Sequence, residues 1–247
     1  MIETKEKPAG TLSDATRDKL AGVSVATLCT ALFKRGLRNQ TIQDVRPVRP
    51  KGRNMVGPAF TLRYIPARED LNRLDVFRNP DHPQRAAVER CPPGAGLVMD
   101  SRKDPRAASA GGILVSRLMV RGVAGVVTDG GFRDSPEIGG LDIPAYHNRP
   151  SSPTNLTLHQ ALDINVAIGC GDVAVWPGDV LVGDDEAVIV VPAEIVDEVA
   201  DEAVEMTAFE DFVTEEVRGG RSIIGLSPAT NPKTLEDYAV WRRKHGR

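Results

Sequence analysis

The sequence predicts an α/β fold with a mixed sheet, and three patterns lead to this prediction. Short apolar runs at 95–100 and 123–130 flank a helical pattern at 113–122, and this strand–helix–strand order is typical of parallel strands. Residues 164–192 form short apolar runs broken by Gly and Pro-Gly turns, which indicates antiparallel hairpins. Residues 193–218 have the spacing of one amphipathic helix, and two glycines follow it. We therefore expect helices on both sides of a mixed sheet and a long C-terminal helix.

The N-terminal region is expected to hold a flexible tail and two helices. The stretch "KPAG" marks residues 1–11 as the tail. Between residues 12 and 35, apolar side chains recur at helical spacing, and Ser13 and Ser24 are suited to cap the two helices. Gly36 is expected to end the second helix.

The remaining segments are assigned in chain order. Residues 54–67 are rich in β-branched and aromatic side chains and predict a strand. Residues 68–94 are polar and punctuated by prolines, which predicts a loop with a short helix. Residues 101–112 are expected to be a loop, and 141–150 to begin with a short strand. Residues 226–247 form a C-terminal extension. We find no strong linker and no internal repeat, so the whole chain, 1–247, is expected to be one domain.

The composition excludes several classes of function. The chain has 247 residues and a net charge of −3, so neither a nucleic acid nor an anionic membrane is an expected partner. No apolar run approaches the roughly 20 residues that span a bilayer, and the N-terminus lacks a signal peptide's apolar segment. The three cysteines, Cys29, Cys91 and Cys170, form no CxxC pair. This pattern disfavours a disulfide framework and fits the cytoplasm.

The stretch "GVVTDGGFRD" (125–134) is the first candidate for a binding site. A predicted strand ends in a glycine turn, the usual position of a ligand crevice in an open α/β sheet. Arg133 is suited to bind a carboxylate and Asp134 to bind a metal ion. The alternative is an exposed turn whose two charges are solvated. A further option is that Asp129 orients Arg133 through a salt bridge.

The stretch "ASAGGILV" (108–115) is the second candidate. It opens a predicted helix, and free backbone N–H groups at such a terminus bind phosphate or carboxylate. The candidate donors are Gly111, Gly112, Ile113 and Leu114. The alternative is an ordinary helix-capping loop. Neither GxxxxGK[ST] nor a GxGxxG between strand and helix is present, which disfavours a nucleotide site.

Together, these stretches resemble the signature of the RraA-like superfamily, which includes the 4-hydroxy-4-methyl-2-oxoglutarate aldolases. That signature runs roughly G-[ED]-L-L, a helix, then G-x-x-G-x-V-x-D-G-x-x-R-D, and its spacing agrees from Gly111 to Asp134. Supporting matches are "VGPAFTL" (56–62), "PGDVLVGDDEAVIVVP" (177–192) and the "GGRS" that follows the long helix.

The resemblance implies a swivelling β/β/α-type domain that assembles as a homotrimer or homohexamer. Aldolases of this superfamily cleave 4-hydroxy-2-oxo acids with Mg²⁺ or Mn²⁺ and release pyruvate. By motif position, Asp134 is the expected metal ligand, Arg133 the expected substrate-binding residue, and residues 111–114 the expected carboxylate-binding backbone. A glutamate from a neighbouring subunit's helix completes the site, and Glu210 is its best match here.

The sequence departs from the superfamily pattern at Gly112. The pattern places an acidic residue there, which helps to position metal-bound water, so its absence puts the standard substrate and the proton-transfer step in doubt. The insertion at 68–85 and the C-terminal extension also exceed the common pattern and indicate a reshaped pocket.

We therefore expect a metal-dependent carbon–carbon lyase acting on a small 4-hydroxy-2-oxo acid or 2-keto-3-deoxy sugar acid. Oxaloacetate decarboxylation is an expected side activity, because it passes through the same pyruvate enolate. One alternative is dehydration of a 2-keto-3-deoxy sugar acid. Another is a non-catalytic protein resembling the superfamily's ribonuclease regulators, although those tend to lack the aspartate that Asp134 matches.

Two other kinds of catalytic site are disfavoured. All eight lysines lie in polar or terminal stretches, which disfavours a Schiff base. The four histidines form no zinc-binding pattern, and only His147 follows an apolar run.

Overall fold

The computed structural model describes residues 12–247, and the predicted N-terminal tail lies outside them. The two predicted N-terminal helices are α1 (Asp14–Ala21) and α2 (Val25–Lys34). Each begins at its predicted cap, because the hydroxyl oxygens of Ser13 and Ser24 accept hydrogen bonds at 3.1 Å from backbone N–H groups three residues later.

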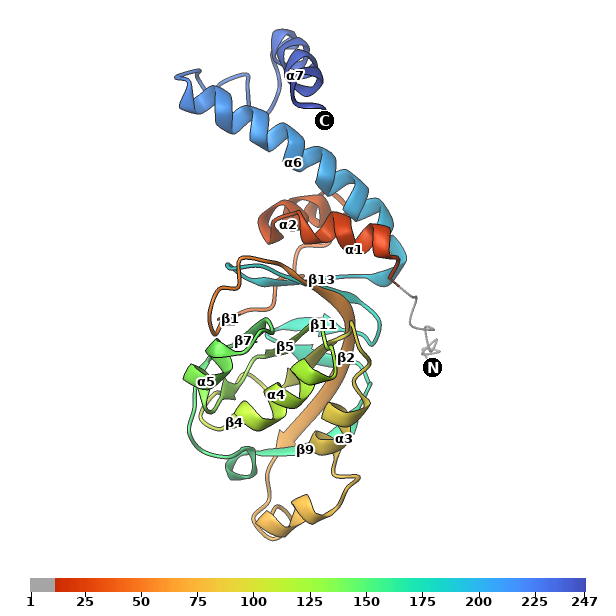
Figure 1. The fold of residues 1–247 in the computed structure, drawn as a ribbon, viewed down its shortest axis with the longest axis vertical. Coiled ribbons are helices and arrows are strands. Elements are labelled where there is room, and N and C mark those ends of the chain that lie inside the picture. Colours follow the sequence, from red (N-terminus) through yellow and green to blue (C-terminus); the bar gives the residue numbers. More distant parts are fainter. Residues whose placement is uncertain (1–11) are drawn as a thin grey trace.

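A mixed sheet of eight strands forms the centre of the fold (Figure 1). Its strands are β1 (Arg46–Pro47), β2 (Met55–Pro66), β3 (Gly96–Asp100), β5 (Gly125–Thr128), β7 (Ala145–His147), β9 (His159–Ile164), β12 (Val180–Gly183) and β13 (Val188–Val191). The order is β1-β7-β5-β3-β2-β12-β13, and β9 also pairs with β2. Strands β7, β5, β3 and β2 are parallel, as the strand–helix–strand order predicts. The predicted hairpins are β12–β13 and β10 (Ile168–Cys170) with β11 (Val173–Val175).

Strand β2 bends the sheet towards closure. One of its edges pairs with β3, while the other pairs with β12 through residues 55–58 and with β9 through residues 62–66. A register shift between Arg63 and Tyr64 marks a β-bulge, which bends a strand. The segment 40–47 then crosses from β13 to β1, so the sheet is nearly closed.

Successive side chains of β2 point to opposite faces of the sheet, and they separate the core into layers. Val56 and Leu62 face helices, whereas Met55 and Ala59 face an inner core that the β10–β11 hairpin fills. Two groups of helices cover different parts of the curled sheet. The first group is α3 (Pro83–Arg90), α4 (Gly112–Val120) and α5 (Ser135–Gly140), and the second is α1, α2 and α6 (Val196–Arg218). Both groups pack against the outer face of the curled sheet, because Val56 and Leu62 lie on the same face of β2 (Figure 1). The β10–β11 hairpin covers the inner face, so the helices do not flank the sheet on both sides as predicted.

A second, small parallel sheet continues the main one. Its strands are β4 (Ala108–Ala110), β6 (Gly131–Phe132) and β8 (Arg149–Pro150). They follow β3, β5 and β7 along the chain, beyond the carboxyl ends of those parallel strands. The prediction of a loop over 101–112 is wrong at β4, because a three-residue strand of small side chains has no sequence pattern and forms only through pairing with β6.

The long C-terminal helix extends beyond the body of the domain. It begins with a 3-10 turn at Ala193–Ile195 and continues as α6, which confirms the predicted helix at 193–218. The extension at 226–247 contains α7 (Pro232–His245), whose Tyr238 and Trp241 rings lie 5.5 and 6.0 Å from that of Phe212. Helix α7 lies against the far end of α6 (Figure 1). None of the helices within the described residues is long and apolar enough to cross a membrane.

His147, at the end of β7, should make the stability of the fold depend on pH. Its buried ring stacks on Phe132 with centroids 5.6 Å apart. Burial, aided by the charge of Arg46, lowers the pKa of His147 from 6.5 to about 4. Below pH 6.5 the histidine of the unfolded chain takes up a proton that the buried ring does not. The fold therefore has its full stability from this group above pH 6.5 and loses it as pH falls towards 4. We expect this group to lower the free energy of unfolding by about 2 kcal/mol between pH 7 and pH 5. Urea titrations of the wild type and His147→Leu at both pH values measure this difference.

The control for this prediction lies in the other buried histidines. Burial also lowers the pKa values of His82 and His159, so His147→Leu should keep a smaller loss of stability in acid. A variant as acid-sensitive as the wild type would contradict the assignment to His147.

Candidate active site

A cavity of about 390 Å³ lies beyond the carboxyl ends of β4 and β6. This is where the crevice of a parallel sheet is expected, because neighbouring strands lead their following loops to one edge. Its wall comes from α3, the start of α4, the turn after β6, and the inserted segment. The lining residues are Leu74, Phe77, Gln84, Arg85, Ala108, Ala110, Gly111, Ile113, Leu114, Arg133, Asp134, Thr154 and Asn155.

Arg133 and Asp134 leave β6 at the mouth of this cavity. The backbone N–H of Arg133 donates to the Ala110 carbonyl at 3.1 Å, which continues the β4–β6 pairing. The Arg133 Nε and Asp134 Oδ2 atoms are 3.6 Å apart, and the two side chains remain 48% and 41% exposed. Asp134 has φ of 59°, in the left-handed region that aspartate and asparagine tolerate best. The turn therefore presents a cation and an anion together to a ligand.

Gly111 lets these side chains approach the start of α4. A Cβ atom on Gly111 would lie 2.6 Å from Arg133 Cγ and 2.9 Å from Asp134 Oδ2. The Gly112 N–H donates to Asp134 Oδ2 at 3.2 Å, and the Leu114 N–H donates to the Gly111 carbonyl at 3.0 Å. Ile113 lies between these donors. As a first-turn residue, its N–H has no acceptor within its own helix.

The structure brings together most of the predicted site residues. Gly111, Ile113, Leu114, Arg133 and Asp134 all line the cavity, and Gly112 adjoins it through its hydrogen bond to Asp134. Glu210 lies elsewhere in the chain, on α6. There its carboxylate accepts a hydrogen bond from the Thr27 hydroxyl at 2.7 Å. A role for Glu210 in the site of a neighbouring subunit remains a prediction.

Sequence reasoning missed a second cation in this cavity. Arg85 lies on α3 and its guanidinium carbon is 4.6 Å from the centre of the Phe77 ring. No carboxylate forms an ion pair with Arg85 among the described residues. Both Arg85 and Phe77 belong to the insertion at 68–85. That this segment is absent from the superfamily pattern was the only feature of the sequence that pointed to these two residues.

Asp129 does not orient Arg133, so that option is corrected. Its carboxylate is fully buried and accepts hydrogen bonds from the backbone N–H groups of Ser101, Lys103 and Gly171 at 2.6, 3.0 and 3.1 Å. Burial raises the pKa of Asp129, and the three donors oppose that rise. Asp129 therefore ties together the loops behind the site.

The side chains at the cavity mouth suit a hard divalent cation. Mg²⁺ prefers oxygen ligands and commonly uses one or two carboxylates while it keeps several waters. Asp134 supplies such a carboxylate, and its 41% exposure leaves room for water. Within residues 12–247, no group of three or more His, Cys, Asp and Glu side chains converges as a metal cluster. This chain alone thus fits a water-rich Mg²⁺ or Mn²⁺ site and not a closed zinc site.

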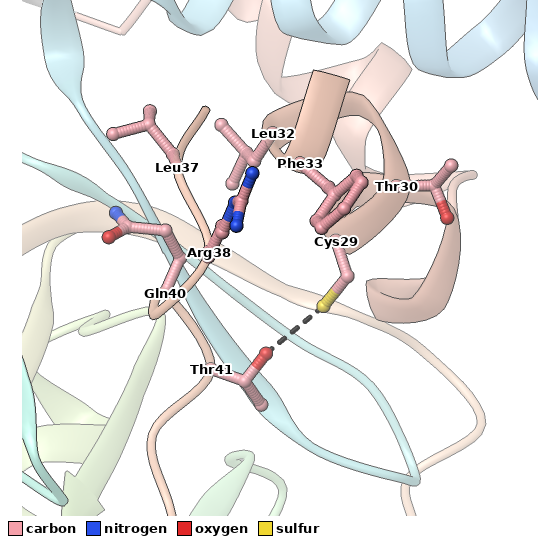
Figure 2. Close-up of a pocket in the computed structure, with 8 residues that line it drawn as sticks. All are labelled: Cys29, Thr30, Leu32, Phe33, Leu37, Arg38, Gln40 and Thr41. Atoms are coloured by element: carbon pink, nitrogen blue, oxygen red, sulfur yellow. Dashed lines mark hydrogen bonds between the residues drawn. The ribbon is translucent and has the colours of Figure 1, made fainter. Parts of the chain in front are cut away.

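A second hollow of about 350 Å³ lies beside α2 (Figure 2). Its wall is mainly apolar, and the Arg38 guanidinium lies over the Phe33 ring at 5.2 Å. The Cys29 Sγ and Thr41 Oγ1 atoms are 3.0 Å apart. None of its lining residues is a carboxylate or histidine, so it lacks the groups that the predicted chemistry needs.

Comparison with known proteins identifies the family. The model of the RraA-like family, described as Aldolase/RraA, matches residues 25–190. A protein of Halalkalibacterium halodurans named "Putative 4-hydroxy-4-methyl-2-oxoglutarate aldolase" is 29% identical over 169 residues, which cover 68% of this chain and 73% of that protein. An uncharacterised Methanocaldococcus jannaschii protein is 33% identical over 115 residues, which cover 46% of this chain and 54% of that protein.

Solved structures give the same result for the fold. The crystal structure of Streptomyces coelicolor RraAS2, described as an unusual member of the RNase ES inhibitor RraA protein family, superposes with a TM-score of 0.72 at 28% identity. The match covers 84% of this chain and 97% of that one. An uncharacterised protein from Pseudomonas syringae pv. tomato superposes with a TM-score of 0.78 at 19% identity and shares the fold, over 92% of this chain and 99% of that one. The mixed α/β architecture, the sheet topology and the sequence signature agree with these matches, and the chain belongs to the RraA-like, or Aldolase/RraA, family.

Proposed function

We propose that this protein is a divalent-metal-dependent lyase that cleaves a small 4-hydroxy-2-oxo acid to pyruvate and a second carbonyl compound. The observation that carries the proposal is the meeting of three groups in one cavity. These are the Arg133 guanidinium, the Asp134 carboxylate and the N-terminus of α4. The aldolase name of the Halalkalibacterium halodurans relative supports the same reaction class.

Each group has a role in this reaction. The carboxylate of the 2-oxo acid binds at the start of α4, where the Ile113 N–H and the helix dipole favour an anion. Asp134 and water would hold Mg²⁺ or Mn²⁺, which would polarise the 2-oxo group when bound. Arg133 stabilises the negative charge that develops on the oxygen as the C3–C4 bond breaks. In an assembly of three or six copies, a neighbouring subunit would add Glu210.

The charge of the cavity favours a substrate with a second carboxylate. Its lining holds two guanidiniums, Arg85 and Arg133, and one carboxylate, Asp134. Arg85 is positioned by its stacking on Phe77 and has no acidic partner among the described residues. The far end of the substrate would therefore place an anionic group against Arg85, which a neutral sugar-acid chain does not provide.

The test of the reaction is metal-dependent pyruvate release. Lactate dehydrogenase would report pyruvate from a panel of 4-hydroxy-2-oxo acids, 2-keto-3-deoxy sugar acids and oxaloacetate, with Mg²⁺, with Mn²⁺ and with EDTA. We expect pyruvate from a 4-hydroxy-2-oxo diacid, lost in EDTA. Water loss from a sugar acid without pyruvate would instead establish the dehydratase. An inactive protein that binds no metal would favour the regulator-like alternative.

Arg85→Met should separate diacid from monoacid substrates. A charge-assisted hydrogen bond contributes about 1.5–3 kcal/mol, so we expect KM for a 4-hydroxy-2-oxo diacid to rise by about 10- to 100-fold. KM for a 4-hydroxy-2-oxo monoacid should stay within about twofold, because methionine preserves the apolar contact with Phe77. Equal changes in KM for both substrates would show that Arg85 supports the pocket but does not bind the second carboxylate.

A further inference from the structure

A carboxylate from another helix occupies the space above Gly112. A Cβ atom on Gly112 would lie 2.9 Å from the Glu137 carboxyl carbon, and 2.9 and 3.0 Å from its two oxygens. Glu137 is in the first turn of α5, three residues after Asp134. Gly112 is also the position at which the family resemblance predicts an acidic side chain. The acid absent from α4 is thus replaced in space by one from α5.

The surroundings of Glu137 favour a functional carboxylate over a structural ion pair. Among the described residues, Glu137 forms neither an ion pair nor a hydrogen bond, and its side chain is exposed. It lies at the N-terminal end of α4, beside the residue whose N–H contacts Asp134. An exposed, unpaired carboxylate can accept a proton from a substrate or from a water at the cavity mouth.

We propose that Glu137 is the proton-transferring catalytic residue of the lyase reaction, in place of the acid that the family pattern has at position 112. This role rests on the proposed function. The Glu137 carboxylate accepts the 4-hydroxyl proton, directly or through one water, as the C3–C4 bond breaks. The C3–C4 electron pair passes to C3 and forms the enolate of pyruvate, while the 4-oxygen becomes a carbonyl oxygen. Glu137 then returns the proton to C3, which yields pyruvate and restores the carboxylate.

A side chain at position 112 would displace the Glu137 carboxylate from its present place. Any side chain there would meet the Glu137 carboxylate at less than a normal contact distance. The carboxylate is the far end of a flexible side chain, so an acid at 112 and an acid at 137 compete for one space. Either residue alone can therefore place a carboxylate at the start of α4, and this exchange is testable.

The first experiment compares Glu137→Gln with the wild type. General acid–base catalysis commonly contributes about 10²–10⁴ in rate, so we expect kcat for diacid cleavage to fall at least about 10²-fold with little change in KM. Calorimetric Kd for Mn²⁺ alone should stay within about twofold, because the exchanged group is not a ligand in this proposal. Asp142→Asn, which removes an exposed surface carboxylate paired with Arg53, is the control and should retain activity.

The second experiment moves the carboxylate back to α4. Glu137→Ala should be as slow as Glu137→Gln, and adding Gly112→Glu should restore at least about tenfold in kcat. Oxaloacetate decarboxylation is the matched reaction, because its C–C cleavage releases CO₂ and needs no proton removed from the substrate. Glu137→Gln should keep that rate within about threefold.

The outcomes separate this role from the reaction itself. A wild type that releases no pyruvate overturns the proposed function and this role with it. An active wild type with a fully active Glu137→Gln overturns only the role of Glu137. A Glu137→Gln variant whose Mn²⁺ affinity falls in step with its activity makes Glu137 a ligand, and a double variant no faster than Glu137→Ala contradicts the shared position.

Discussion

Asp134→Asn is expected to abolish metal-dependent pyruvate formation while the protein stays folded. Asparagine has the same shape, tolerates the left-handed backbone of this position and can still accept the Gly112 N–H. It removes the negative charge that would hold the cation in the proposed site. Because a catalytic metal ion contributes several kcal/mol, we expect kcat/KM to fall at least about 10³-fold. Coupled pyruvate assays measure this loss, and calorimetry with Mn²⁺ should show weaker binding in parallel.

The control for Asp134→Asn is Asp142→Asn. Asp142 pairs with Arg53 on the surface and lies outside the cavity, so its loss removes the same charge without touching the site. Thermal unfolding of both variants should remain close to that of the wild type. If Asp134→Asn kept normal Mn²⁺ affinity, the metal would have to be held elsewhere in the protein.

Local patterns predicted most of the regular structure because each depends on near neighbours in the chain. Ser13 and Ser24 cap their helices through bonds that span three residues. The alternation of β2 and the order of β3, α4 and β5 follow from burial on one face and from right-handed crossover connections. By contrast, β4 could not be predicted, because its three small residues become a strand only by pairing with β6.

The candidate site was predicted only where it is local in sequence. The glycines at 111 and 112 and the Arg133–Asp134 pair belong to two short stretches joined by one helix, so a motif can identify them. Arg85 lines the cavity from α3, and the Glu137 carboxylate lies at the start of α4 from α5, and no spacing in the sequence relates either residue to the site. The option that Asp129 orients Arg133 was wrong, because proximity along the chain does not reveal that the Asp129 carboxylate is buried behind the site.

Gly111→Ala should impair catalysis far more than stability. The new methyl group would lie 2.6 Å from Arg133 Cγ and 2.9 Å from Asp134 Oδ2, so both side chains must move. They can move because their ends are about half exposed, at 48% and 41%, which limits the cost to folding. Catalysis tolerates such a shift poorly, since a displacement of about 1 Å can cost about 10²-fold in rate.

We therefore expect kcat/KM of Gly111→Ala to fall about 10²-fold, with Mn²⁺ affinity also weakened because Asp134 is displaced. The matched control is Gly140→Ala at the end of α5, where a Cβ atom meets nothing within 4 Å. Gly140→Ala should keep its activity and its unfolding midpoint. Steady-state kinetics and thermal unfolding of the pair distinguish a crowded site from a general cost of adding a methyl group. If Gly111→Ala were fully active, the close approach of Arg133 and Asp134 to α4 would not be needed for the reaction.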